Sequence, residues 1–210
     1  MTAQAGQASV RGGAAFALAQ QTREIREYRD VLTQLVRQFL TLRYRRTLLG
    51  YLWTLVNPLL MMSVTAVVFA TLFKLDLATY AVFLFAGMVP WNFFSMSATQ
   101  SCTSYIQNEG LIKKIYLPKI IFPLSLCLGM LIDSLLSMAA LFLVVVPLGG
   151  KVSAALLVIP VAYLLLFAFA LGVALILSVM TVFFRDLQYV ISVLMQAWFF
   201  LTPVMYRHDA

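Results

Sequence analysis

Charged side chains are scarce in this sequence: of its 210 residues only 11% are Asp, Glu, Lys or Arg, whereas 62% are hydrophobic. A soluble domain of this length needs far more polar side chain to cover its surface, so the composition excludes a soluble globular protein. The two cysteines, Cys102 and Cys127, show no metal-ligand spacing. We interpret both as small hydrophobic residues on the membrane side of the protein, and we expect no bridge between them.

The sequence also lacks the polar residue sets of an enzyme. There is one histidine, His208, and no Ser–His–Asp combination, no pair of carboxylates in an apolar stretch and no phosphate-binding glycine loop. A membrane-embedded transferase or protease needs several polar groups that converge on one site. We therefore expect no catalytic residue, metal site or cofactor on this chain. Residues 1–26 lack the apolar core of a signal peptide and predict a weakly ordered tail.

Long apolar stretches are what the sequence has in abundance. They are about 20 residues long, the length that a helix needs to cross a hydrocarbon layer of ~30 Å. The stretches are continuous rather than alternating, and backbone groups in lipid must be satisfied internally, so they predict helices. We expect Pro58 to bend the first stretch, Pro90 to interrupt the second and Pro203 to break the last. The predicted fold is an all-α polytopic bundle within residues 51–210, with five spans at 52–73, 80–101, 122–147, 154–184 and 187–205.

Residues 27–50 precede the first span and follow a different pattern. Apolar residues such as Val31, Leu35 and Phe39 recur at helical spacing, and polar residues such as Arg29 and Arg37 occupy the other side. This pattern predicts an amphipathic helix with a basic polar face, suited to the plane of a membrane surface. A helix packed on a soluble domain is the alternative, but no soluble domain follows it.

Basic residues are distributed unevenly between the two sides of the predicted bundle. Three of the 15 fall on one side: Lys74, Lys151 and Arg207. The other twelve share the side of the N-terminus: eight arginines before the first span, and Lys113, Lys114, Lys119 and Arg185. Because basic residues concentrate on the cytoplasmic side of bilayers, we predict a cytoplasmic N-terminus. This topology and attraction to anionic lipids explain the net charge of +7 without nucleic-acid binding.

Asp133 is the one ionisable residue that falls inside a predicted span. A charged aspartate at the centre of such a helix costs roughly 2.5–3.5 kcal/mol on insertion scales. We therefore expect it to face protein or water, or to stay protonated, with Ser134, Ser137 and Thr65 as candidate partners. An interhelical hydrogen bond and a polar lining of a transport path both remain open.

Residues 107–119 form a polar segment between the second and third spans. They combine charged residues with Leu111, Ile112 and Ile115, as expected of a short helix that a partner's groove can hold. An ordinary basic loop is an equally good interpretation. Aromatic residues gather around Trp91 and Trp198, where they can stack on sugars or simply anchor and pack the helices.

Several blocks of the sequence resemble the polysaccharide-export branch of the type-2 ABC transporter permeases, in the order found in that family. The blocks are RYRRTLLGYLW at 43–53, the Asn57–Pro58 pair, GMVPWNFF at 87–94, residues 108–118, FRDL at 184–187 and FFLTPVMY at 199–206. The resemblance covers the chain from about residue 27 to its end. It implies a half-transporter of the bacterial inner membrane that forms a homodimer and pairs with a separate ATP-binding subunit, which holds ATP and Mg. Members of this family export O-antigen, capsule or teichoic-acid polymers, often linked to lipid.

The resemblance also assigns candidate roles to residues. The gate helix would include Arg37, Arg43, Tyr44, Arg45 and Arg46. The coupling helix, about 108–116, would contact the ATPase subunit through Asn108, Glu109, Gly110, Leu111, Ile112, Lys113 and Lys114. The glycan path would be lined by Tyr51, Trp53, Trp91, Phe93, Phe94, Trp198, Phe199 and Phe200.

The chain stops at Ala210, where family members usually continue with an external re-entrant segment and a sixth span. The resemblance therefore implies an incomplete chain that lacks the sixth span. Two other functions remain as alternatives: a type-2 ABC exporter of a drug or lipid, and a membrane-integrated glycolipid enzyme.

Overall fold

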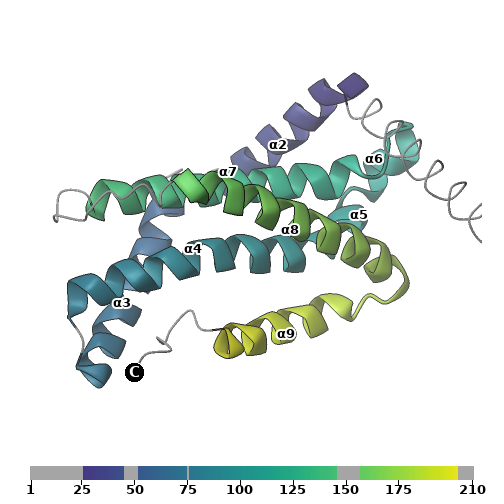
Figure 1. Cartoon of the computed structure of the whole chain (residues 1–210). Helices are drawn as coiled ribbons and strands as arrows, with labels where there is room; N and C mark the ends of the chain where they lie inside the picture. The colour runs from purple at the N-terminus through teal and green to yellow at the C-terminus, as the bar shows by residue number, and fades with distance from the viewer. Residues whose placement is uncertain (1–25, 45–51, 75, 146–156, 203–210) are drawn as a thin grey trace, which may run out of the picture.

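The structure is a computed structural model that describes residues 26–44, 52–74, 76–145 and 157–202 (Figure 1). These residues form helices connected by short turns, and no strand occurs among them. The predicted all-α fold is thus confirmed. In chain order the helices are α2 (Arg29–Tyr44), α3 (Leu52–Phe73), α4 (Leu77–Ser101), α5 (Ser104–Gln107), α6 (Glu109–Lys114), α7 (Ile121–Val145), α8 (Val158–Phe183) and α9 (Leu187–Leu201).

Three of the described helices are long and apolar enough to cross a membrane, and their apolar stretches are Tyr80–Ser101, Ile121–Phe142 and Val158–Phe183. The apolar stretches of α3 and α9 are shorter, at Leu59–Leu72 and Leu187–Leu201. The 15 residues of α9 extend about 22 Å at 1.5 Å per residue, less than the ~30 Å hydrocarbon layer. The count of five spans therefore stays a prediction.

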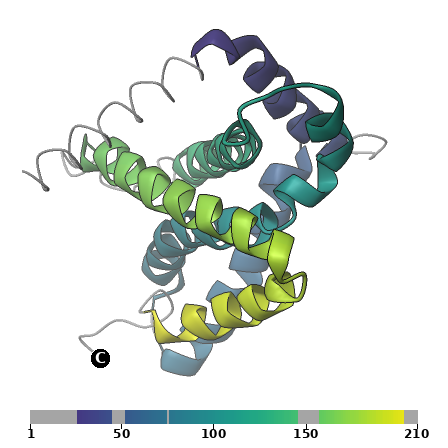
Figure 2. The ribbon, with the colours of Figure 1, turned by 90° about the vertical axis from the view of Figure 1, so that its right-hand side faces the viewer.

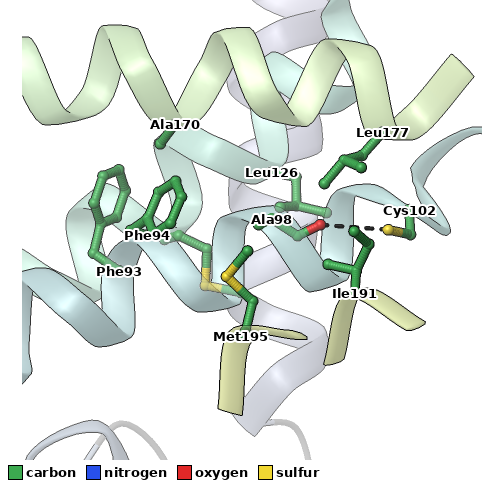
Figure 3. Packing of buried hydrophobic residues seen from close by; sticks show 10 residues of the cluster. Phe93, Phe94, Ala98, Cys102, Leu126, Ala170, Leu177, Ile191 and Met195 are labelled. Carbon is green, nitrogen blue, oxygen red and sulfur yellow. Dashed lines mark hydrogen bonds between the residues drawn. The ribbon is translucent and has the colours of Figure 1, made fainter. Parts of the chain in front are cut away.

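Helix α4 lies at the centre of the bundle, in contact with α3, α7, α8 and α9 (Figures 1 and 2). Its small residue Ala98 and the α8 residues Ala170 and Ala174 are fully buried. Small side chains let membrane helices approach closely, and this favours van der Waals packing. Figure 3 shows the resulting core, in which Ile191 and Met195 of α9 point toward α4.

The predicted interruption at Pro90 is not observed, because α4 continues through this residue without a break. A proline inside a helix removes one backbone donor and crowds the preceding turn. Helices in membranes tolerate this change because neighbouring helices and small local adjustments satisfy the freed group. The packing of α4 against four other helices therefore outweighs the local preference of the proline.

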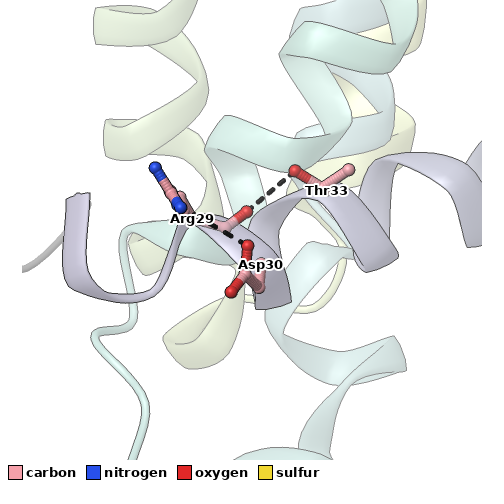
Figure 4. A network of polar contacts seen from close by, with 3 residues as sticks. All are labelled: Arg29, Asp30 and Thr33. Atoms are coloured by element: carbon pink, nitrogen blue, oxygen red, sulfur yellow. Dashed lines mark hydrogen bonds and ion pairs between the residues drawn. The ribbon is translucent and has the colours of Figure 1, made fainter.

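Helix α2 packs against α7 through its apolar side. Phe39 lies over Gly129 of α7, so closely that a Cβ at that glycine would overlap the ring. On the polar side Arg29 and Asp30 are exposed, and Arg29 Nε lies 3.6 Å from Asp30 Oδ1 (Figure 4). The Thr33 hydroxyl donates to the Arg29 carbonyl at 2.8 Å.

The two sides of α2 follow the predicted pattern except at two positions. Leu42 continues the spacing of Val31, Leu35 and Phe39 and was therefore expected on the apolar side, but it is 55% exposed; Leu40, which does not fit that spacing, is buried. Packing on α7 rather than periodicity alone thus decides which residues are covered. Arg45 and Arg46 of the predicted gate helix lie outside the described residues.

Candidate functional site

Helix α6 occupies the end of the bundle where α4 connects to α7 (Figure 1). None of its residues is buried, and Leu111 and Ile112 are only partly covered. Glu109 lies in its first turn and Lys113 and Lys114 in its last, which suits the partial charges at the ends of a helix. This charge arrangement favours the short helix, one of the two interpretations that the sequence left open for this segment; its contact with a partner stays a prediction.

Charged residues of α6 and of the α8–α9 turn lie within electrostatic range of one another at this end of the molecule. Lys113 Nζ lies 2.5 Å from Glu109 Oε1. The hydrogen bond and charge of Lys113 lower the pKa of Glu109, and the charge of Arg185 in the α8–α9 turn lowers it slightly further. The α5–α6 segment and the α8–α9 turn therefore lie at the same end of the bundle, as Figures 1 and 2 also show. The α3–α4 turn lies at the opposite end.

A second candidate region is an aromatic cluster formed by α4, α8 and α9. The Trp91 ring centroid lies 6.3 Å from that of Trp198 and 5.7 Å from that of Phe199. The Phe94 ring centroid lies 5.8 Å from that of Trp198 and 5.3 Å from that of Phe169 on α8. The Phe94–Phe169 pair is stacked, Trp91–Phe199 is tilted and the two contacts of Trp198 are edge-on. Stacked and edge-on arrangements are the ones that aromatic pairs prefer.

The predicted path residues differ in how accessible they are. Phe93 and Phe94 are buried in the core, whereas Trp198 and Phe200 are 46% and 62% exposed. Trp53 lies on α3 and is exposed, and Tyr51 lies outside the described residues. Trp198, Phe200 and the α8 residue Phe169, which is 55% exposed, thus present their rings at the surface of the described chain.

Phe169 of α8 was missed by the sequence interpretation, although it belongs to this cluster. It lies in a long apolar stretch, where the sequence does not distinguish a phenylalanine in an aromatic cluster from one that faces lipid. Only the packing of α8 against α4 reveals its contact with Phe94.

Asp133 is buried in α7. Of its candidate partners, Ser134 hydrogen-bonds Tyr163 of α8 at 3.0 Å, and the Ser137 hydroxyl donates to the Asp133 backbone carbonyl at 2.9 Å. The Thr65 hydroxyl donates to the Met61 carbonyl at 2.8 Å. The Ser134–Tyr163 hydrogen bond joins two membrane helices, and the sequence interpretation missed the tyrosine.

The described part of the chain contains no group of three or more His, Cys, Asp or Glu residues that could hold a metal ion. Cys102 and Cys127 are buried and free. The described residues thus offer two candidate regions: the charged, exposed helix α6 at one end of the bundle, and the aromatic cluster formed by α4, α8 and α9.

Comparison with known proteins shows the family to which this chain belongs. The family described as ABC-2 type transporter matches residues 30–210. The "O-antigen export system permease protein RfbA" of Myxococcus xanthus is 33% identical to this chain over 184 residues, which are 88% of the chain and 71% of that protein. Two proteins of the same name from Klebsiella pneumoniae are 33% and 31% identical, each match covering 86% of the chain and 70% of the relative. This chain, a multi-pass membrane protein, belongs to the ABC-2 type transporter family.

Proposed function

We propose that this chain is the membrane subunit of an ATP-driven exporter that moves a lipid-linked polysaccharide across the bacterial inner membrane. The observation that carries the proposal is the match with O-antigen export permeases along 86–88% of the chain. A transporter of this family includes an ATP-binding partner. ATP and Mg would be held by that separate subunit, so the permease itself is not an enzyme.

Two copies of the permease form the channel in this proposal, and α6 meets the ATP-binding subunit in the cytoplasm. The support is the exposure of α6, which has no buried residue, and the charge of Arg185, which acts on Glu109 from the same end of the bundle. The segment 115–116 extends this surface, since Ile115 and Tyr116 are 52% and 91% exposed. Exposed apolar residues with charges around them are suited to a partner's groove.

The aromatic cluster is the proposed contact for the glycan. Rings can stack on the apolar faces of sugars without fixing the sugar in one position. Trp198, Phe200 and Phe169 are exposed, while Phe93 and Phe94 lie in the core. The N-terminus, with its arginines and α2, is placed on the cytoplasmic side because basic residues concentrate there.

The test is to express the complete permease with its ATP-binding subunit and to measure both their association and polymer export. Glu109→Lys places three positive charges together with Lys113 and Lys114 on α6, so we expect export to fall by at least tenfold while the permease stays in the membrane. Glu109→Gln, which removes the charge without reversing it, is the matched control and should retain most of the export. Absence of association with any ATP-binding subunit, together with full export by Glu109→Lys, would refute the proposal.

A further inference from the structure

The surface of α9 that the bundle leaves uncovered has two unlike sides. The first side follows helical spacings of four, three and four residues, so its members share one face. They are Val190, Leu194, Ala197 and Leu201, and all four are apolar and exposed. An exposed face with no polar group suits contact with lipid tails.

The second side collects the polar residues of the helix, again at spacings of three or four. It consists of Tyr189, Ser192, Gln196 and Phe200, all exposed, and we call it the α9 polar face. Together with the adjoining Gln188 it includes every hydroxyl-bearing and amide-bearing side chain of α9. None of the 15 residues of this helix is charged, so the face is polar and neutral.

The position of α9 places this face at the depth of the hydrocarbon layer. The helix lies alongside the second half of α4, which is long enough to cross a membrane. Trp198 meets Phe94 with ring centroids 5.8 Å apart, and Ile191 and Met195 share a buried cluster with Ala98 (Figure 3). A helix in the plane of the membrane surface would not follow α4 in this way. Lipid is an unfavourable neighbour for an amide or a hydroxyl at this depth.

The face offers hydrogen-bond donors and acceptors and an aromatic ring. The Gln196 amide has two donor hydrogens and an acceptor oxygen, and it forms no hydrogen bond with another residue that the structure describes. The Ser192 hydroxyl donates to the Tyr189 carbonyl at 2.7 Å, so its oxygen can still accept a hydrogen bond. The side chains of Tyr189 and Phe200 are 72% and 62% exposed.

We propose that the α9 polar face lines the glycan path and that Gln196 is the residue that hydrogen-bonds the hydroxyl groups of the sugar. This rests on the proposed function, which places the exposed rings of Trp198 and Phe200 beside the same path. A sugar presents hydroxyls that both donate and accept, and apolar faces that stack on rings. Another helix is a poorer occupant, because close helix packing in membranes favours small residues, whereas Tyr189 and Phe200 are bulky.

The first experiment determines what covers position 196. Gln196→Cys and the matched control Leu194→Cys, on the apolar side of the same helix, are made in the complete permease with its ATP-binding subunit. Their reaction with a water-soluble maleimide is timed in open membrane fragments. The reactive thiolate forms in water rather than in apolar surroundings, so we expect position 196 to react at least tenfold faster than position 194.

The same fragments test for a sugar. Neutral oligosaccharides built from glucose, mannose or galactose are added one at a time. We expect at least one of them to slow the reaction at position 196 by threefold or more. The control is Lys113→Cys on α6, outside the path, whose reaction should keep its rate.

Three results would overturn the proposal. Equal reaction rates at 196 and 194 would place the face against lipid. Efficient disulfide formation between two copies of Gln196→Cys, without maleimide labelling, would identify a second α9 as the occupant. Fast labelling that no oligosaccharide slows would show a water-lined face without a sugar contact.

The second experiment measures export of the polymer to the cell surface. Gln196→Leu removes the amide and keeps a side chain of similar size, so we expect about fivefold lower export, the factor that one net hydrogen bond supplies. The amount of permease in the membrane and its association with the ATP-binding subunit should not change. Gln196→Asn, which keeps the amide, should retain most of the export, and the control Leu194→Met should retain all of it.

The two experiments separate this proposal from the proposed function. Full export by Gln196→Leu, in cells where the wild type exports the polymer, would refute the contact and leave the exporter function in place. If the wild type exports no polysaccharide but an oligosaccharide protects position 196, the glycan contact stands and the exporter function fails.

Discussion

At the scale of single residues, two glycines inside apolar helices have opposite surroundings. A Cβ at Gly129 of α7 would overlap the Phe39 ring of α2, whereas a Cβ at Gly172 of α8 would have no heavy atom within 4 Å. Glycine in a helix interior is less favourable than alanine by roughly 0.5–1 kcal/mol. The close approach of Phe39 therefore explains the glycine at 129, while no contact explains the one at 172.

The two glycines predict substitutions of opposite sign. Gly129→Ala should lower the free energy of unfolding by about 1–3 kcal/mol because it overpacks the α2–α7 contact. Gly172→Ala, the matched control, should raise it by about 0.5–1 kcal/mol through helix propensity alone. Unfolding in mixed micelles of increasing denaturing detergent measures both. Adding Phe39→Leu to Gly129→Ala should recover part of the loss, and equal shifts in the two alanine variants would contradict the proposed docking of α2.

Lys74, which follows α3, carries a positive φ of 53°. In this left-handed region a residue with a Cβ is strained by about 1–2 kcal/mol, whereas glycine is not. Lys74→Gly should therefore stabilise the protein by about 1 kcal/mol in the same unfolding assay. Lys74→Ala keeps the Cβ and removes only the charge, so it should give no comparable gain. A gain in the alanine variant would mean that charge rather than backbone strain limits stability at this turn.

At the scale of helices, the aromatic cluster links α4 to α9. Trp91 contacts Trp198 and Phe199, and Trp198 also contacts Phe94. Each such pair contributes roughly 0.5–1.5 kcal/mol beyond the area it buries. The cluster is thus able both to hold α9 against the bundle and to present rings to a glycan.

Trp91→Ala and Trp198→Ala should each reduce polymer export severalfold while association with the ATP-binding subunit stays intact. The reason is that the rings are proposed to line the path, whereas α6 makes the partner contact. Phe183→Ala is the control, since Phe183 is 76% exposed on α8 and lies outside the cluster. Export and pull-down assays on the same membranes separate the two effects. Full export by both tryptophan variants would leave the rings with a packing role only.

Much of the helical architecture follows from patterns that the sequence carries locally. Apolar length predicts the membrane helices, and helical spacing predicts the two sides of α2. Positions that depend on a neighbour could not be predicted in this way: Phe94 is buried because α8 and α9 cover it, and Gly129 matters because Phe39 lies on it. The continuity of α4 through Pro90 was also missed, because proline's local effect is offset by packing on other helices.

The candidate site was predictable only in part, for the same reason. The mixed charges of 108–116 indicated an exposed helix, and α6 is one. The packing of α5, which precedes this helix, against α8 joins segments that are far apart in the sequence, and no local pattern reveals it. Tyr163, the partner of Ser134, was missed for the same cause.

At the scale of the whole molecule, the chain separates its charges along the bundle. The end formed by α5–α6 and the α8–α9 turn carries Lys113, Lys114 and Arg185, whereas Lys74 follows α3 at the opposite end. Many side chains of α8 and α9 that face outward are large and apolar, as expected of helices surrounded by lipid or by further protein in the membrane. This separation is what the positive-inside pattern requires if α6 faces the cytoplasm.

The most direct test of the account is the side of the membrane on which α6 lies. Lys113→Cys and Lys74→Cys can be treated in intact cells with a membrane-impermeant maleimide, and the native thiols give little background because Cys102 and Cys127 are buried. We predict labelling of the cysteine at position 74 in intact cells and labelling of the one at position 113 only after the cells are lysed. Labelling at position 113 from outside intact cells would place α6 away from any cytoplasmic ATP-binding subunit and contradict the account.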